Sequence, residues 1–365
     1  MSFRYIKVKT KGQIEGEKLL VPKLRFKKFN NEYKKYKIGD TLKVKSGKDQ
    51  KLIECPNGKY PILGTGGQIG TTNNFLYDKP SVLIGRKGTI NKPQYMTTPF
   101  WTVDTLFYTD IKEGFNTKYI FYAFQNINWK KYDESTGVPS LSCKTIEEIL
   151  YYIPNKDEQD KISTFITLLD KKIELQQRRI EALKIYKRGL IKKIFGDIKD
   201  NDSIRLKDLY HFAYGEGNTN PDNGGIYPVY GANGKIGGFN KYNAEYSVII
   251  GHMGAYAGNV LFEENKHFVT YNGTIAIPKN IKILRPKFGY YMLLNANLPR
   301  ICAGSGMPFL SYEILNNIKV KLPNIKAQEK CEKVLEKTEA KIKLEKRKFK
   351  NLSQLKKSLL QQMFI

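Results

Sequence analysis

Apolar residues recur at alternating intervals of four and three along two long, glycine-poor segments, which is the spacing of helices that pair side by side. The expected seam residues are Ile162, Ile166, Leu169, Ile173, Ile180 and Leu183 in the first segment and Leu335, Ile342, Phe349 and Leu352 in the second. At about 35 residues each, the segments predict helices of about 50 Å. We expect them to form an antiparallel coiled coil. The alternative is that each helix packs on its own neighbouring domain.

A different pattern precedes each helical segment: short runs of apolar and β-branched residues, separated by clusters of Gly, Asn and Pro. The runs include "SVLIG" from Ser81, "YSVIIG" from Tyr246 and "GTIAIP" from Gly273. Such runs are typical of short strands joined by turns, with one or two helices, such as "NTKYIFYAFQNIN", between them. The pattern predicts β-rich α+β domains.

The two halves of the chain match each other. "YPILGTGGQIG" from Tyr60 matches "YPVYGANGKIGG" from Tyr227 at an offset of 167 residues, and "GVPSLS" from Gly137 matches "GMPFLS" from Gly306 at an offset of 169. The second offset also aligns "IPNKDEQDK" with "LPNIKAQEK", where each domain gives way to its helix. A duplication of one domain with one helix explains this repeat.

The repeat and the change in composition set the expected boundaries. A first domain with a basic N-terminal segment covers residues 1–154, and a helix covers 155–199. A second domain covers 200–323, and a C-terminal helix covers 324–365. The predicted fold class is therefore α+β, with two β-rich globular domains in tandem, each followed by a long α-helix.

Charge narrows the class of partner. The 365 residues include 62 Lys and Arg against 35 Asp and Glu, a formal net charge of +27. This excess favours a polyanion, because Lys and Arg side chains displace its condensed counterions. Nucleic acid is favoured over a membrane surface, since no apolar run approaches the roughly 20 residues of a spanning helix. The N-terminus has no apolar signal region, so we expect a cytoplasmic location and no membrane partner.

The sequence shows no recognisable catalytic or metal-binding motif. Neither glycine-rich stretch has the Gly-x-x-x-x-Gly-Lys-Ser/Thr of a phosphate loop, so we interpret both as tight turns. Histidine occurs only in the second half, so a duplicated centre cannot require it. The four cysteines lack the Cys-x-x-Cys spacing of zinc sites. The Asn/Asp-Pro-Pro-aromatic tetrapeptide of amino-group methyltransferases is also absent. We expect no catalytic residue and no bound metal.

Several local features, repeated in the same order, are similar to the DNA-specificity (S) subunit of type I restriction-modification enzymes. They are "LVPKLRF" near Leu20, "YKIGD" from Tyr36, the "YPILGTGGQIG" and "SVLIG" pairs, and the "GVPSLS" to "YYIPNKDEQDKI" transition into helix. The resemblance covers nearly the whole chain. It implies that each globular part is a target recognition domain reading one half of a bipartite double-stranded DNA site, while the helices set the separation of the halves.

The resemblance also implies partners and cofactors that the residues alone do not show. Two methyltransferase (M) subunits would dock on the helical region and use S-adenosylmethionine. Restriction/translocase (R) subunits would join them and use ATP and Mg. No cofactor would bind to this chain directly.

Polar residues beside the paired turns are the expected DNA contacts, because Arg and Lys match guanine edges and Asn and Gln match adenine edges. The candidates are Lys48, Gln68, Thr71, Asn73, Arg86 and Lys87 in the first domain and Lys235, Asn240, His252 and Asn272 in the second. The basic segment before them is either a source of phosphate affinity or a mobile arm. Two other functions stay open: a self-contained DNA methyltransferase or nuclease, and a decoy or adaptor that does not read DNA.

Overall fold

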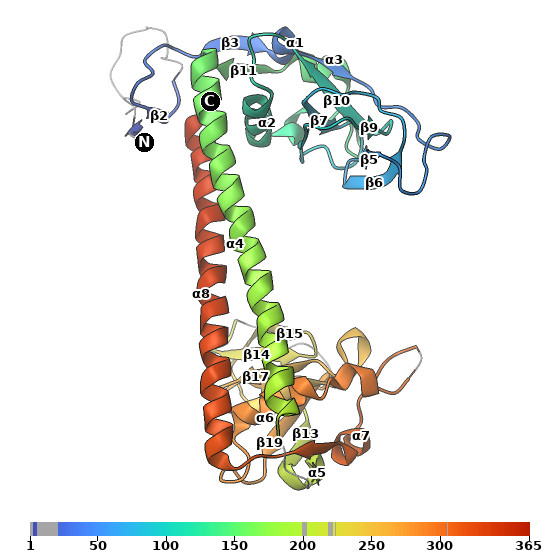
Figure 1. Ribbon diagram of the computed structural model, residues 1–365, viewed down its shortest axis with the longest axis vertical. Coiled ribbons are helices and arrows are strands. Elements are labelled where there is room, and N and C mark those ends of the chain that lie inside the picture. Colours follow the sequence, from blue (N-terminus) through green and yellow to red (C-terminus); the bar gives the residue numbers. More distant parts are fainter. Residues whose placement is uncertain (1–2, 6–20, 199–202, 218–221, 223, 305) are drawn as a thin grey trace. The chain divides into compact units, whose positions relative to one another are not determined.

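The computed structural model describes residues 3–5, 21–198, 203–217, 222, 224–304 and 306–365 (Figure 1). Its contacts divide the chain into two units, which we call the first unit (Met1–Gln176 with Lys348–Ile365) and the second unit (Gln177–Arg347). Two long helices, α4 (Lys156–Gly196) and α8 (Ile325–Met363), each contribute to both units. Each unit therefore contains one β-rich domain and part of both helices.

The first unit is made of short strands and three short α-helices. Its strands are β1 (Phe3–Tyr5), β2 (Leu24–Phe26), β3 (Lys34–Lys37), β4 (Leu42–Lys45), β5 (Tyr60–Gly64), β6 (Gly67–Thr72), β7 (Ser81–Gly85), β8 (Gln94–Met96), β9 (Trp101–Thr102), β10 (Leu106–Ile111) and β11 (Leu150–Ile153). Its helices are α1 (Ile38–Thr41), α2 (Thr117–Asn126) and α3 (Cys143–Glu148), with the 3-10 turn η1 (Trp129–Tyr132).

The second unit repeats this order of elements. Its strands are β12 (Ser203–Arg205), β13 (Tyr210–Tyr214), β14 (Tyr227–Gly231), β15 (Gly234–Phe239), β16 (Ser247–Gly251), β17 (Val260–Glu263), β18 (Phe268–Val269), β19 (Gly273–Pro278) and β20 (Lys319–Lys321). Its helices are α5 (Leu206–Leu209), α6 (Pro286–Asn295) and α7 (Tyr312–Asn317), with the 3-10 turns η2 (Gly254–Tyr256) and η3 (Leu298–Ile301).

Each unit contains an antiparallel four-stranded sheet and a three-stranded hairpin sheet. The four-stranded order is β4-β10-β7-β8 in the first unit and β13-β19-β16-β17 in the second. The hairpin sheets are β6-β5-β9 and β15-β14-β18, in which β9 and β18 run parallel to their neighbours. The predicted α+β class, with two β-rich domains in tandem, is confirmed.

The two glycine-rich stretches form β-hairpins, which confirms their interpretation as tight turns. Residues 65–66 connect β5 to β6, and residues 232–233 connect β14 to β15. The next residues, Gly67 and Gly234, have φ angles of 118° and 121°. Side chains clash with the backbone in this conformation, so glycine is needed at both places.

A buried glutamine anchors each long helix to its own domain. Gln159 of α4 is 2% exposed; it accepts a hydrogen bond from Asn116 N (2.9 Å) and its amide donates to Pro154 O (3.0 Å). Gln328 of α8 is fully buried and likewise accepts from Arg285 N (3.0 Å). Asn116 and Arg285 are the residues that precede α2 and α6. The repeated segments "IPNKDEQDK" and "LPNIKAQEK" therefore supply the glutamine that joins the start of each long helix to the start of a domain helix.

Replacing Gln159 by alanine is expected to lower the free energy of unfolding of the first unit by about 2–3 kcal/mol, because the half-buried N–H of Asn116 and the buried C=O of Pro154 lose their partner. Both tryptophans, Trp101 and Trp129, lie in this unit, so urea unfolding followed by tryptophan fluorescence reports on it. Lys172→Ala, at an exposed position in the part of α4 that belongs to the first unit, is the control and should change stability by less than about 0.5 kcal/mol. Equal stability of the Gln159 variant and the original chain would contradict the anchoring role.

Residues 21–37 fold onto the first unit. Leu24 and Phe26 join its core, and Arg25 between them is 1% exposed. The Arg25 guanidinium donates two hydrogen bonds to the buried Glu158 carboxylate, from Nε (2.8 Å) and from Nη2 (2.6 Å). This ion pair connects β2 to the first turn of α4. The described part of the basic N-terminal segment is thus folded, while residues 6–20 lie outside the described residues.

Within each unit, α4 and α8 pack antiparallel against each other (Figure 1). In the first unit, Ile162 and Ile166 of α4 share one core with Leu359 and Met363 of α8 and with residues of α2. The helices therefore contact each other and their domain at once. Of the expected seam residues, those that are buried are Ile162, Ile166, Leu169, Ile180, Leu335 and Ile342, and those that are half-buried are Ile173, Leu183, Phe349 and Leu352.

Lysines fill the same gap in both apolar seams, and each pairs with a carboxylate on the other long helix. In the first unit, Lys356 Nζ lies 2.7 Å from Asp170 Oδ1, and the Tyr122 hydroxyl of α2 donates to the same carboxylate (2.8 Å). In the second unit, Lys187 Nζ lies 2.5 Å from Glu339 Oε1, and the Tyr291 hydroxyl of α6 donates to the same carboxylate (2.9 Å). Each carboxylate thus links three helices.

Burial and the neighbouring Glu339 carboxylate raise the pKa of Tyr291 well above its usual value, so this hydroxyl stays a donor at neutral pH. The same causes, burial first and then the Asp170 carboxylate, raise the pKa of Tyr122. Both tyrosine hydroxyls therefore remain hydrogen-bond donors to the helix pair at neutral pH.

Candidate nucleic-acid interface

In the first unit, loops gather at one edge of the four-stranded sheet. β4 and β7 end there and β10 begins there, because β10 is antiparallel to both neighbours. Main-chain hydrogen bonds join the loops: Arg86 N donates to Thr105 O (2.8 Å), and Leu141 N donates to Arg86 O (2.9 Å). We call this region the first strand-end surface and define it by the residues Ser46, Lys48, Arg86, Lys87, Thr105 and Ser140.

The second unit builds the same edge from β13, β16 and β19. His252 N donates to Asn272 O (2.8 Å), and Leu310 N donates to His252 O (2.8 Å). Two expected DNA-binding residues, His252 and Asn272, are therefore direct neighbours. We call this region the second strand-end surface and define it by the residues Tyr214, Glu216, His252, Met253, Asn272 and Phe309.

Matching backbone contacts make the two surfaces equivalent position by position. The bridge between Lys87 and Ser140 corresponds to that between Met253 and Phe309. The hydrogen bond from Lys48 N to Thr102 O corresponds to that from Glu216 N to Val269 O. The equivalent pairs, first unit before second, are Ser46 and Tyr214, Lys48 and Glu216, Arg86 and His252, Lys87 and Met253, Thr105 and Asn272, and Ser140 and Phe309. The two surfaces share a backbone and differ in chemistry.

Gly85, at the end of β7, makes this edge possible. A Cβ added there would collide with the carbonyl oxygen of Thr89, and one added at Gly251, the equivalent residue, would collide with that of Tyr256. Glycine therefore lets the loop that follows each strand fold back against the strand end. The repeated "SVLIG" and "SVIIG" runs end in glycine for this reason.

Two of the residues expected to bind DNA form hydrogen bonds to the segment that precedes the first hairpin sheet. The Thr71 hydroxyl accepts from Gly58 N (3.0 Å) and donates to Cys55 O (2.7 Å). The Asn73 side chain accepts from Lys59 N (3.2 Å). Both side chains hold the segment before β5 against β6.

The other hairpin candidates are exposed. Gln68 of β6 donates to Gly70 O (3.2 Å) in its own strand, and Lys235 and Asn240 lie at exposed positions on and just after β15. β9 connects the first hairpin to the strand-end surface, since Val103 N, directly after it, donates to Leu63 O (3.1 Å). The hairpin residues therefore flank the strand-end residues of the same unit.

An aromatic stack organises the second strand-end surface. The rings of Tyr214 and Tyr312 lie 4.0 Å apart with an angle of 18° between their planes, and the His252 ring lies 4.4 Å from Tyr214. His252 Nδ1 lies 3.0 Å from Leu310 O, so it carries the proton and Nε2 is the acceptor of the neutral ring. Burial and the neighbouring Tyr214 raise the pKa of Tyr312 to about 12.

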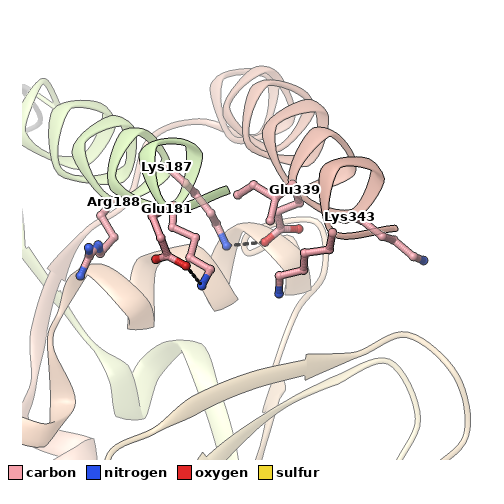
Figure 2. Close-up of a pocket in the computed structure, with 8 residues that line it drawn as sticks. Glu181, Lys187, Arg188, Glu339 and Lys343 are labelled. Carbon is pink, nitrogen blue, oxygen red and sulfur yellow. Dashed lines mark hydrogen bonds and ion pairs between the residues drawn. The ribbon is translucent and has the colours of Figure 1, made fainter. Parts of the chain in front are cut away.

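A separate cationic groove of about 660 Å³ lies between α4 and α8 in the second unit (Figure 2). Its lining residues are Glu181, Lys184, Lys187, Arg188, Glu339, Ile342, Lys343 and Lys346. Lys187 pairs with Glu339 and Lys184 with Glu181, at 2.5 Å and 2.8 Å. Arg188, Lys343 and Lys346 supply further positive charge, which makes the groove a candidate anion-binding surface.

The part of the chain that the structure describes contains neither a cluster of metal ligands nor a membrane-spanning helix. His, Cys, Asp and Glu side chains there form no group of three or more that could hold a metal ion. No helix there is both long and apolar enough to cross a bilayer. The four cysteines are free and half-buried.

Sequence reasoning missed part of both strand-end surfaces. Tyr214 is the last residue of β13 and Ser46 directly follows β4. Phe309 and Ser140 lie in the repeated loop "GMPFLS" or "GVPSLS". That loop was visible as a repeat and could have been nominated. The contact of the Tyr214 and Tyr312 rings joins residues 98 positions apart, and no local signal marks it.

Comparison with known proteins agrees with this architecture. A family model, the type I restriction modification DNA specificity domain, matches the chain twice, over residues 30–184 and 198–354. The chain belongs to this family. Each match starts within the β-rich part of one repeat and continues into a long helix, as the sequence repeat predicts.

Curated relatives are type I specificity subunits. One from Mycoplasma pneumoniae is 26% identical over 220 residues, covering 56% of this chain and 81% of the relative. The EcoprrI specificity subunit of Escherichia coli is 24% identical over 153 residues, covering 40% of this chain and 38% of the relative.

Solved structures show the same fold. The crystal structure of a type I restriction-modification S subunit from M. genitalium has a TM-score of 0.65 at 20% identity and covers 94% of this chain and 99% of its own. A structure from a study of type I system assembly and conformational transition has a TM-score of 0.57 at 11% identity, covering 90% and 96%. The chain is thus a type I specificity subunit by family, with two domains consistent with recognition of a bipartite site. The family implies DNA binding and assembly with other subunits.

Proposed function

We propose that each unit reads one half of an asymmetric bipartite DNA site through its strand-end surface. The observation that supports this most directly is that the two surfaces share one backbone arrangement but carry different side chains at equivalent positions. Base edges are distinguished by the type of side chain that meets them in the major groove. Two unlike readers in one chain would therefore select two unlike half-sites.

The proposed reading residues lie on the strand-end surfaces with side chains that reach solvent. In the first unit they are the exposed Lys48, Arg86 and Lys87, flanked by Gln68. In the second they are the half-buried His252 and Asn272, flanked by the exposed Lys235 and Asn240. Thr71 and Asn73 are assigned a supporting role, because the Thr71 hydroxyl and the Asn73 side-chain oxygen already bond to the backbone of the segment before β5. The cationic groove of the second unit would add phosphate contacts, which position DNA without reading it.

The helices are proposed to set the half-site separation and to dock two M subunits. Leu175 and Leu344 are equivalent in the repeat and are 64% and 50% exposed; Tyr186 and Leu355 are likewise equivalent and are 59% and 49% exposed. Large apolar side chains kept exposed at matching positions are typical of protein contact sites. Two equivalent apolar positions on each helix suit two copies of one partner.

Catalysis is assigned to the partners. The M subunits would use S-adenosylmethionine to methylate adenine, and the R subunits would use ATP and Mg to translocate and cleave. This chain would hold none of these cofactors and would supply sequence recognition and assembly.

The test is to co-express the chain with its cognate M subunits and to map N6-methyladenine in plasmid DNA. One asymmetric bipartite motif that depends on this chain is the expected result. The absence of any chain-dependent motif, with the complex assembled, would show that the chain does not read DNA.

Arg86→Ala is expected to weaken binding of this complex to the mapped site by about 10- to 100-fold and to relax specificity in one half-site only, because a bidentate Arg–guanine contact discriminates by about 1–3 kcal/mol. Binding is measured by fluorescence anisotropy with duplexes mutated in either half. Arg205→Ala, at an exposed position outside both strand-end surfaces, is the control and should bind as the original chain does. Equal relaxation in both halves would argue against a half-specific role for Arg86.

A further inference from the structure

The second strand-end surface exposes large apolar side chains. Tyr214 is 42% exposed, Phe309 40%, Tyr256 49% and Met307 65%. Tyr256, Met307 and Phe309 come from two loops that a main-chain hydrogen bond joins, since Gly254 N donates to Pro308 O (2.8 Å). Tyr214 ends β13, and its ring lies 4.4 Å from that of His252. Solvent exposure of so many apolar groups at one edge is unfavourable unless a partner covers them.

The fold does not require these side chains. In the first unit the positions equivalent to Tyr214, Tyr312 and Phe309 carry Ser46, Cys143 and Ser140, so the tyrosine stack of the second unit is replaced there by a serine and a cysteine. The same backbone thus forms with small polar side chains. Folding therefore does not explain the aromatic side chains of the second unit, which points to a ligand that they contact.

The charge of the second surface argues against phosphate as its ligand. Glu216 occupies the place of Lys48, and His252 and Met253 occupy those of Arg86 and Lys87. A carboxylate repels phosphate, and the lysines and the arginine that would attract phosphate in the first unit have no lysine or arginine counterpart at these positions. The ligand that fits is a neutral, apolar group presented among hydrogen-bonding groups.

We propose, on the basis of the proposed DNA-reading function, that the second strand-end surface recognises thymine 5-methyl groups in the major groove. The methyl is the apolar feature of an A·T pair in that groove, and apolar side chains contact it directly. His252 and Asn272 lie beside the apolar side chains and supply hydrogen bonds to the adjacent base edges. The first strand-end surface, with arginine and two lysines, instead suits the two acceptors of guanine.

The test uses the mapped target site in a 40-base-pair duplex in which every thymine of one half-site is replaced by deoxyuridine, which removes only the methyl group. We call the half-site read by the second unit the second half-site and the other the first half-site. Binding of the complex of this chain with its M subunits is expected to weaken by about fourfold for each methyl group lost from the second half-site. The same replacement in the first half-site is the matched control and should change affinity by less than twofold. No greater effect in the second half-site would overturn the inference, while specific binding of the unmodified site would leave the proposed function intact.

Phe309→Ser and Tyr214→Ser introduce the residues of the first unit and so preserve a known form of this edge. Each is expected to reduce the difference between thymine and deoxyuridine to less than twofold while the complex with the M subunits still assembles in gel filtration. Loss of M-subunit assembly with an unchanged preference for thymine would identify the surface as a protein contact and overturn the inference.

Discussion

Replacing Glu158 by glutamine is expected to lower the free energy of unfolding of the first unit by about 3–5 kcal/mol. Arg25 and Glu158 are 1% and 0% exposed and are joined by two hydrogen bonds. Glutamine has nearly the same shape but no charge, so the buried Arg25 guanidinium would be left without its counter-ion. An uncompensated buried charge costs far more than the pair contributes when complete. The variant should therefore be less stable than any surface variant of the same unit.

Glu148→Gln is the matched control. Glu148 pairs with Lys37 at 2.6 Å, but the two side chains are 56% and 51% exposed. Exposed pairs contribute up to about 1 kcal/mol, so this variant should unfold close to the original chain. Urea unfolding followed by the fluorescence of Trp101 and Trp129 reports on the first unit for both variants. If both variants lost the same free energy of unfolding, burial of the Arg25–Glu158 pair would not add to its effect on stability.

Removing one heptad from both long helices is expected to shorten the preferred gap between half-sites by about three base pairs. Deleting residues 171–177 of α4 and 349–355 of α8 retains the ion pairs Asp170–Lys356 and Lys187–Glu339 and preserves the phase of both apolar seams. Seven residues correspond to about 10 Å of helix, which is about three base pairs of DNA. Binding to the original site should then be lost, with affinity restored on a site with the shorter gap.

The measurement is selection from a duplex library that holds both half-sites fixed and varies the gap. Deleting the heptad from α4 alone is the control: it shifts the ion-paired residues by two turns, so the helices cannot keep both pairs. We expect this variant to aggregate or to bind no site. An unchanged gap in the double deletion would show that the helix pair does not set the separation.

The sequence determined the elements whose signal is local or repeated. The spacing of Ile162, Ile166 and Leu169 predicts a helix with one apolar stripe, and the structure buries all three. The repeat predicted two equal domains, and both sheets have the same strand order. Periodicity and turn chemistry act within a few residues, so they can be read along the chain.

The sequence favoured pairing of the two long helices over docking of each helix on its own domain, and the structure shows that the helices do both. An apolar stripe indicates that a face is buried but not against what, and the structure shows the N-terminal part of α4 in one core with α8 and α2. The sequence also did not indicate that the seam lysines, Lys187 and Lys356, form ion pairs with the other long helix. Lys356 meets Asp170 and Tyr122 only because three helices converge, and those residues are up to 234 positions apart in the chain.

The residues of the candidate DNA-binding surfaces were likewise predicted in part from the sequence and in part only from the structure. Composition, charge and the repeated turns located Arg86, Lys87, His252 and Asn272 near strand ends, because glycine and strand signals are local. Only the tertiary structure decided that Thr71 and Asn73 bond to the backbone and that Tyr214 stacks on Tyr312. Such contacts depend on the antiparallel order of strands that bring distant loops to one sheet edge, and a side chain's partner is fixed by that approach in space rather than by its neighbours in sequence.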